Sequence, residues 1–462
     1  MAELYLRSGR VVTEHGVYQG GVVVSEGRIE QLVYGDPAIR ADDVIDCTGK
    51  LILPGLIDAH VHFSEPGRGH WEGWRTGTMA AAAGGITTVI EMPLNASPPT
   101  IDRAALAAKQ SVAARDALVD YALWGGLVTD NLGQIDELHA EGVIGFKAFL
   151  SSSGSDFARI DDDLLYAGLL RAQQLGTLVG VHAENEWVTR HLGTRLQAAG
   201  RRDRRAWGEA RPPVAELEAI RRALFWAEAT GGRLHVVHVS LAEGIKAIAA
   251  AKTAGVAATA ETCPHYLLFD EDDFDRIGPT AKCAPPLRAR REVEALWRCV
   301  LAGQVDIIAS DHSPCLWEEK ERGEHDVWAA WGGISGLQTL LPALLTEGVH
   351  RRGLDLPALV RMTAANPARI FGLYPRKGSL LPGADADLVV VDPAREWTLT
   401  ATQLLYKNQH SAFVGYPFRG RVQQTWVRGA PVYREDEIVA SPGSGQLLRV
   451  SHSSPPHSQP RT

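Results

Sequence analysis

Residues 56–62, LIDAHVH, decide the fold class, because they form an apolar run that ends in two histidines. Nearly continuous apolar residues are typical of strands in parallel sheets, which are covered on both faces. Side chains alternate across a strand, so residues two apart lie on the same side. The segment therefore predicts a buried strand whose carboxyl end presents His60 and His62 together.

Seven more apolar runs follow, and a segment long enough for a helix comes after each of the eight. The seven are TTVIEMP (87–93), DYALWGGL (120–127), GVIGFKAFL (142–150), TLVGVHAE (177–184), LHVVHVS (234–240), VAATAETCPHYL (256–267) and VDIIASDHS (305–313). Eight strand-helix units in series predict an α/β fold, the (β/α)8 or TIM-type barrel. An open doubly wound sheet is the alternative, but no Gly-rich phosphate loop opens any of the helices.

The barrel is expected to span residues 54–372, with a different texture on either side of it. Residues 1–53 and 373–434 alternate short β-type runs with Gly turns, so the two chain ends are predicted to form one small flanking β-sandwich domain. Residues 435–462 are rich in Ser, Pro and Gly, with too little apolar content to fold alone. They are predicted to be a disordered tail.

The composition excludes several classes of protein. With 462 residues, 45% hydrophobic and 22% charged, the chain is in the ordinary globular range. It carries 47 basic and 55 acidic residues, a net charge of -8, and no Lys/Arg-rich run, which argues against nucleic acid as a partner. No segment resembles a signal peptide or a membrane span, so a cytoplasmic location without a membrane partner is expected.

The five cysteines form no C-x-x-C pair, and they are interpreted as reduced thiols. Their spacing favours neither a disulfide framework nor a thiolate zinc site.

Residues of the types that bind metals stand at the ends of three other runs: His182, His238 and Asp311. A barrel brings the carboxyl ends of its strands to one face, so these residues should converge with His60 and His62. Neutral imidazoles and a carboxylate suit zinc and similar divalent ions and leave a position open for water. A hydrogen-bonded core histidine explains any one of these residues, but not the whole set at one face.

Two further histidines are placed by strand alternation. His235 is three residues from His238 and should lie on the opposite face, packed against a helix. His312 follows Asp311 and should point away from it, as a supporting residue at most.

Lys147 stands in the apolar run GVIGFKAFL, where an unpaired ammonium would cost several kcal/mol. Three interpretations remain open. The side chain snorkels to water, or it has a lowered pKa and acts as a base, or it reacts with carbon dioxide to give a carbamate that bridges two metals.

Taken together, these residues resemble the cyclic amidohydrolases, a family that includes dihydroorotase, hydantoinase/dihydropyrimidinase and allantoinase. The resemblance runs from about Gly49 to Arg428. Its most specific segments are PGLIDAHVHFSEPGR, GGITTVIEMPLN, GFKAFLSSSG, HAENE, ETCPHYL, KCAPPLR, ASDHSPC and GGISGLQTLLPALL.

The resemblance implies a binuclear centre of two divalent metal ions, zinc, with cobalt or manganese as alternatives. It implies that His60 and His62 bind one ion, and that His182 and His238 bind the other. A carboxylated Lys147, carrying carbon dioxide as its carbamate, would bridge the two ions, and Asp311 would complete the first site. A hydroxide between the metals would attack a ring amide carbon, and Asp311 would move its proton to the leaving nitrogen.

Departures from the family pattern select a branch. Dihydroorotases have an Arg where this chain has Ser64, and hydantoinases have a Tyr in the run that here reads Lys147-Ala-Phe-Leu-Ser-Ser-Ser-Gly154. The remaining segments resemble the allantoinase branch, which opens allantoin to allantoate in purine degradation, although many of its members have Asn at the Ser64 position. The alternatives are a hydrolase of another cyclic ureide, resembling hydantoinase, and, more remotely, a non-catalytic barrel scaffold.

Allantoin is small and neutral, so its pocket is expected to offer short polar groups instead of a charged clamp. Asn95, Ser313 and Ser335 are the candidate substrate contacts, and the loop Ser151 to Asp156 has the composition of a lid. Relatives of this kind are commonly tetramers, so the resemblance also implies a homotetramer.

Overall fold

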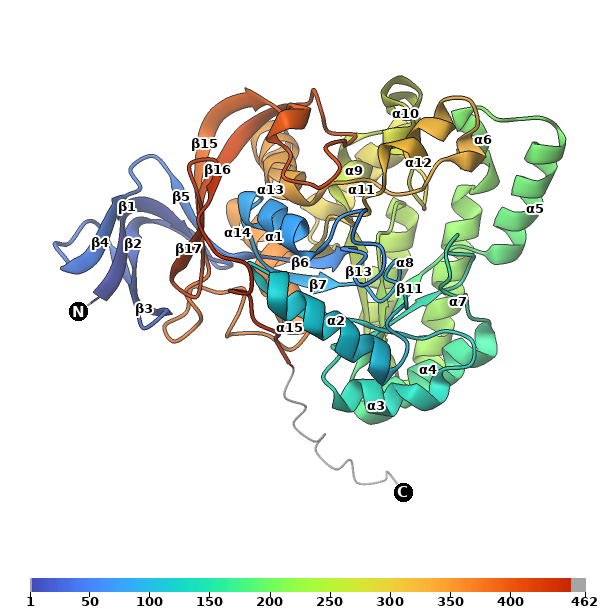
Figure 1. Cartoon of the computed structure of the whole chain (residues 1–462), viewed down its shortest axis with the longest axis horizontal. Helices are drawn as coiled ribbons and strands as arrows, with labels where there is room; N and C mark the ends of the chain where they lie inside the picture. The colour runs from blue at the N-terminus through green and yellow to red at the C-terminus, as the bar shows by residue number, and fades with distance from the viewer. Residues whose placement is uncertain (1, 450–462) are drawn as a thin grey trace.

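The computed structural model describes residues 2–449. Figure 1 shows strands from both ends of the chain side by side, in blue and red, next to a larger body of strands and surrounding helices. No helix within this part of the chain is long and apolar enough to cross a membrane.

The larger body is the predicted barrel. Its strands are β6 (Leu56–Val61), β7 (Ile86–Glu91), β8 (Asp120–Leu123), β9 (Gly125–Gly126), β10 (Phe146–Phe149), β11 (Leu178–His182), β12 (Arg233–Val236), β13 (Ala258–Thr262) and β14 (Ile307–Ile308). Neighbours in this ring pair in parallel, and β8 and β9 are separated only by Trp124. A parallel bridge between Val61 and His312 closes the ring, so the (β/α)8 prediction is confirmed.

Helices cover the barrel and connect its strands. They are α1 (Trp74–Ala83), α2 (Arg103–Asp116), α3 (Ile135–Ala140), α4 (Asp162–Leu175), α5 (Glu186–Ala198), α6 (Arg204–Ala210), α7 (Pro213–Thr230), α8 (Ala242–Thr253), α9 (Pro264–Leu268), α10 (Glu271–Ile277), α11 (Arg290–Leu301), α12 (Trp317–Glu321), α13 (Leu340–Ala343), α14 (Leu356–Val360) and α15 (Asn366–Ile370). Local signals mark several ends. Asp102 caps α2 by accepting from Ala105 N, and Gly231 ends α7 in the left-handed conformation.

The strands of the two chain ends share one nine-stranded sheet. They are β1 (Ala2–Val12), β2 (Val17–Ser25), β3 (Arg28–Tyr34), β4 (Ala41–Asp46), β5 (Leu51–Pro54), β15 (Leu388–Thr398), β16 (Pro417–Val427), β17 (Ala430–Arg434) and β18 (Glu437–Ile438). The two ends meet at β5, where Ile52 pairs in parallel with Val11 and antiparallel with Val390. Hydrogen bonding between strands far apart in sequence therefore builds the flanking β-domain.

The start of the predicted tail differs from expectation. Residues 435–449 include β18 and a segment that runs along the barrel, where Tyr121 N donates to Gln446 O at 3.0 Å and Leu448 N donates to Tyr121 O at 2.7 Å. Leu448 is buried. Backbone hydrogen bonds and the buried side chain of Leu448 hold this segment against the barrel. Amino-acid composition does not show such contacts, so it did not predict this ordered segment. Residues 450–462 lie outside the described part of the chain.

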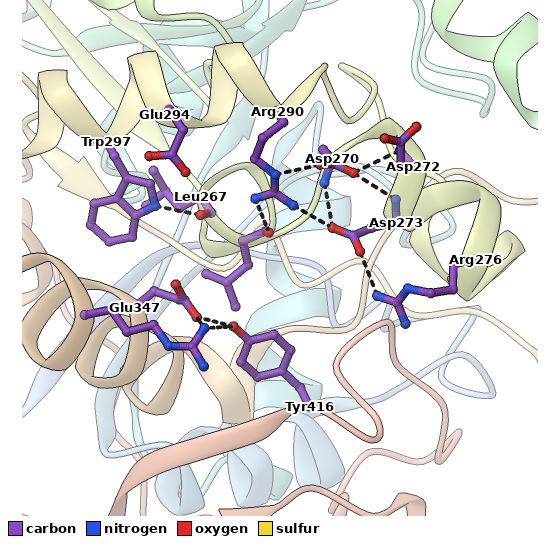
Figure 2. A network of polar contacts seen from close by, with 12 residues as sticks. Leu267, Asp270, Asp272, Asp273, Arg276, Arg290, Glu294, Trp297, Glu347 and Tyr416 are labelled. Atoms are coloured by element: carbon purple, nitrogen blue, oxygen red, sulfur yellow. Dashed lines mark hydrogen bonds and ion pairs between the residues drawn. The ribbon is translucent and has the colours of Figure 1, made fainter.

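Polar contacts join the barrel helices to the β-domain (Figure 2). Glu347 lies in the π-helix Leu344–Arg351 after α13 and accepts a hydrogen bond from the hydroxyl of Tyr416, just before β16. On the barrel side, Arg290 of α11 donates to Asp270 at 2.7 Å, and Trp297 donates to the carbonyl of Leu267 at 2.6 Å. These contacts connect α11 to the α9–α10 segment.

Candidate metal centre

The first group of candidate ligands gathers at the carboxyl end of β6. Nε2 of His60 and Nε2 of His62 lie 3.3 and 3.4 Å from Oδ1 of Asp311, which follows β14. Nδ1 of His60 lies 2.8 Å from Oε1 of Glu261 on β13. Burial alone would raise the pKa of Glu261, but His60 and His235 lower it to about 2, so its ionised carboxylate accepts a hydrogen bond from the Nδ1–H of His60. Nε2 of His60 therefore keeps its lone pair for a metal ligand bond.

The spacing of these atoms fits a divalent ion. Ligand atoms about 2.1 Å from a tetrahedral ion lie about 3.4 Å from one another, close to the separations of the two Nε2 atoms from Oδ1 of Asp311. Metals bind neutral imidazole, and burial lowers the pKa of His62 to about 4. The donor set and its protonation therefore suit zinc or a similar ion.

A second pair of histidines converges beside the first group. Nδ1 of His182, at the end of β11, lies 3.1 Å from Nε2 of His238. The other nitrogen of His182, Nε2, lies 2.8 Å from Oε2 of Glu184, which also accepts a hydrogen bond from Arg211. Burial opposes ionisation of Glu184, but Arg211 and His182 lower its pKa to about 2. The carboxylate fixes the proton of His182 on Nε2, which leaves Nδ1 free to bind a metal.

Lys147 lies on β10 with its side chain buried. Its Nζ has no hydrogen-bond partner within residues 2–449 and lies 5.1 Å from the centre of the Phe149 ring. Burial lowers the pKa of Lys147 to about 7, although Glu261 and Asp311 act in the opposite direction. An unpartnered buried amine with a lowered pKa is suited to react with carbon dioxide, and snorkelling is excluded because the side chain does not reach water.

Two histidine placements need separate comment. His235 was expected to face a helix, but it lies inside the barrel, with Nδ1 2.8 Å from Thr259 Oγ1 and Nε2 3.4 Å from Glu261 Oε2. The alternation argument failed because β12 ends at Val236 and His238 has a φ of 39°. His312 is buried near Glu72, at 3.4 Å, and its Nδ1 accepts from Gly336 N.

A cavity of about 280 Å³ opens beside these residues. His60, His62, His182, His238 and Asp311 line it, as do Asn95 and Ser313. Ser335 does not: it is buried, and its carbonyl accepts from Ser411 Oγ at 2.5 Å. Lys147 is buried and is not among the lining residues.

The cavity is also more charged and more aromatic than expected. Trp207, Arg211, Lys282, Trp328 and Trp331 all line it, whereas sequence analysis predicted only short neutral groups. Lys282 belongs to KCAPPLR, Glu184 to HAENE and Glu261 to ETCPHYL. For Lys282, Glu184 and Glu261, the signal available in the sequence was a charged residue beside or within an apolar run. Their partners come from other segments of the chain, so the sequence did not show which residues they contact.

The loop that was predicted to act as a lid borders the same cavity. Ser152, Ser153 and Gly154 line it, and Ser152 N donates to Oε2 of Glu186 at 2.8 Å. The guanidinium of Arg68 forms two hydrogen bonds of 3.2 Å with the carboxylate of Asp156. This ion pair joins the loop after β10 to the loop after β6.

The chain is similar to known proteins along nearly its whole length. The Amidohydrolase family matches residues 51–432. The allantoinase of Rubrobacter xylanophilus is 50% identical over 448 residues, 97% of each chain, and that of Solibacter usitatus is 45% identical over 450 residues, 97% of each chain. The solved structure of L-hydantoinase (dihydropyrimidinase) from Arthrobacter aurescens has a TM-score of 0.95 and 35% identity, and the match covers 97% of this chain and 100% of that one.

Proposed function

This chain belongs to the amidohydrolase family, and from that premise we propose that it is an allantoinase, which hydrolyses the hydantoin ring amide of allantoin to give allantoate. The observation that carries the proposal is the convergence of His60, His62 and Asp311, with ligand atoms 3.3 and 3.4 Å apart, at the mouth of a small-molecule cavity. The choice of allantoin as substrate rests on the two relatives, which are named allantoinases and align with this chain over 97% of its length.

The proposed centre holds two divalent metal ions, zinc by preference and cobalt or manganese as alternatives. His60, His62 and Asp311 would hold one ion, and His182 and His238 would hold the other. Lys147, carboxylated by carbon dioxide, would lie between them; its buried, unpartnered Nζ supports this assignment. Divalent ions in such a site supply a Lewis acid for a carbonyl oxygen and lower the pKa of water.

Within that centre the protein moves one proton. Asp311 accepts a hydrogen bond of 3.1 Å from Ser313 Oγ, which orients its carboxylate at the cavity. As water adds to the ring carbonyl carbon, Asp311 takes a proton from it and then passes the proton to the ring nitrogen as the C–N bond breaks. Asn95 and Ser313 line the cavity and are proposed to contact the substrate.

The second candidate is a hydantoinase-like hydrolase of another cyclic ureide. It is favoured by the TM-score of 0.95 to the L-hydantoinase structure. Against it, the run from Lys147 to Gly154 offers no phenol, and the named relatives above 40% identity are allantoinases.

The deciding experiment compares the hydrolysis of allantoin, hydantoin, dihydrouracil and dihydroorotate. The protein is loaded with zinc, cobalt or manganese in the presence of bicarbonate. We expect the highest kcat/KM for allantoin. Preference for hydantoin or dihydrouracil would support the second candidate. Inactivity on all four compounds with metal bound would remove both candidate functions, and only the family assignment would stand.

We also propose a homotetramer in the cytoplasm. The proposal rests on resemblance to tetrameric relatives, and light scattering tests it: a monomer mass of 50.0 kDa would remove it.

A further inference from the structure

One cation in the cavity has no assigned role. Lys282 follows the short turn Pro279–Ala281 and lines the same cavity as the candidate metal ligands, with its side chain buried. Burying an ammonium costs free energy unless its hydrogens find hydrogen-bond acceptors, so the contacts of Nζ indicate the role of this residue.

The contacts of Lys282 leave part of its hydrogen-bonding capacity unused. Nζ donates to the carbonyl of Ala330 at 2.6 Å and lies 4.0 Å from the centre of the Trp207 ring. Among residues 2–449, no carboxylate lies within ion-pair distance of it. An ammonium has three hydrogens, so the single carbonyl and the aromatic face do not use all of them.

The neighbouring polar groups are already committed. Arg211 binds Glu184, and the indole nitrogen of Trp207 donates to the carbonyl of Cys283 at 2.7 Å. By contrast, Nε1 of Trp331 is buried without a hydrogen-bond partner among the residues described. Lys282 Nζ therefore has hydrogen-bonding capacity left at a cavity-lining residue, whereas Trp331 Nε1 is covered by the protein and is not accessible from the cavity.

Lys282 is separate from the candidate ligand set in its contacts, because its Nζ binds the carbonyl of Ala330 and lies over the Trp207 ring, and neither residue is a candidate metal ligand.

From this arrangement, and resting on the proposed allantoinase activity, we propose that Lys282 determines specificity by donating a hydrogen bond to the carbonyl oxygen of the ureido arm of allantoin. The scissile ring takes the place beside the histidines, so the arm is the part of the substrate left for this wall. A carbonyl oxygen is a hydrogen-bond acceptor, which matches the unused hydrogens of the Lys282 ammonium. Hydantoin has the same ring without the arm and cannot use this contact.

The test measures KM and kcat for allantoin and the inhibition constant of hydantoin as a competitor, in the wild type and in Lys282→Met. Loss of a hydrogen bond from a charged donor is expected to raise KM for allantoin about 10- to 100-fold. The kcat value should change little, because the arm is bound equally in the ground and transition states. The inhibition constant of hydantoin should change by less than about twofold. Lys282→Gln, which keeps a donor, should give an intermediate KM and covers the case in which the Met variant folds poorly.

Lys252→Met is the matched control. Lys252 lies on α8, pairs with Asp306 at 2.5 Å with its side chain 38% exposed, and does not line the cavity. The variant makes the same substitution and should leave the ratio of the allantoin KM to the hydantoin inhibition constant unchanged. An unchanged allantoin KM in Lys282→Met, an equal loss of hydantoin binding, or the same ratio change in Lys252→Met would overturn the proposal. A wild type that does not hydrolyse allantoin would instead remove the proposed function itself.

Discussion

Asp311 and Lys147 contribute different properties to the candidate centre. Asp311 offers one oxygen to two imidazoles and lines the cavity, whereas Lys147 is buried outside the lining, and its Nζ has no hydrogen-bond partner among residues 2–449. Exposure to the cavity suits a group that exchanges protons with substrate. Enclosure suits a group whose task is to hold metal.

Replacement of these two residues should therefore separate metal binding from turnover. We expect Asp311→Asn to keep much of the metal, because an amide oxygen can still act as a ligand, but to lose most of kcat, because it cannot take a proton. Lys147→Ala should lose both. Metal content by elemental analysis and kcat for allantoin measure the two effects. Near-normal activity of Lys147→Ala without an added short carboxylic acid would contradict the bridging role.

Lys282 should also make the free energy of unfolding depend on pH. Burial, followed by Lys320 and Arg211, lowers the pKa of Lys282 to about 7 from 10.5. Between these values the unfolded chain holds more protons at this position than the folded chain, so this group makes stability rise with pH. Below pH 7 the side chain is charged in both states, so the full free-energy cost of burying the ammonium remains. We expect the free energy of unfolding of the wild type, relative to Lys282→Met, to increase from pH 7 to 10. Denaturant titrations with matched metal loading measure it, and a difference that is independent of pH would refute it.

At the scale of elements, the contacts in Figure 2 hold α11 and the π-helix Leu344–Arg351 in place. Glu347 is buried and binds Tyr416, Arg351 and Arg352, the last at 2.7 Å. Arg351 ends the same π-helix and Arg352 directly follows it, whereas Tyr416 lies just before β16, so the contact with Tyr416 fixes the position of the π-helix relative to β16.

Glu347→Gln should lower the free energy of unfolding by about 1 to 3 kcal/mol, because a buried charge-assisted network loses its anion. Metal content should be unchanged, since Glu347 does not line the cavity. Glu294→Gln is the control, because Glu294 binds the same Arg352 at 2.8 Å with its side chain 45% exposed. Exposed pairs contribute less, so an equal loss in both variants would argue against the network.

For the whole molecule, one buried cation, Lys377, connects two distant parts of the chain. Nζ of Lys377 lies 2.6 Å from Asp120, 2.8 Å from Asp387 and 3.0 Å from Asp385. Asp120 begins β8 in the barrel and Asp387 precedes β15 in the β-domain. The ammonium thus joins the two domains at the end of the barrel away from the candidate metal centre.

Lys377→Met should cost about 3 to 5 kcal/mol in the free energy of unfolding, because it leaves buried carboxylates without their cation. Arg376→Met is the matched control: Arg376 binds Asp385 at 2.9 Å but has a side chain 50% exposed. It should cost less than about 1 kcal/mol. Thermal and denaturant unfolding measure the free energy of unfolding of both variants. Similar losses would show that the buried cation contributes no more to stability than the exposed one.

Local sequence determined the barrel and the residue types available at its carboxyl face. The apolar runs that end at His60, His182 and Asp311 carry their own burial pattern, so the fold and the family could be predicted without any tertiary contact. The ligand roles of these residues stay a prediction, although the structure brings their side chains together.

Tertiary structure decided which side chains support those residues and which enter the cavity. Glu261 meets His60 and His235 only because β13 lies beside β12 in the closed ring, and the backbone at His238, not strand alternation, set where His235 points. Lys282 enters the cavity because its loop packs against Ala330, almost fifty residues away. Burial pattern is a property of neighbouring residues along the chain, whereas each of these contacts depends on the closure of the barrel and the path of its loops.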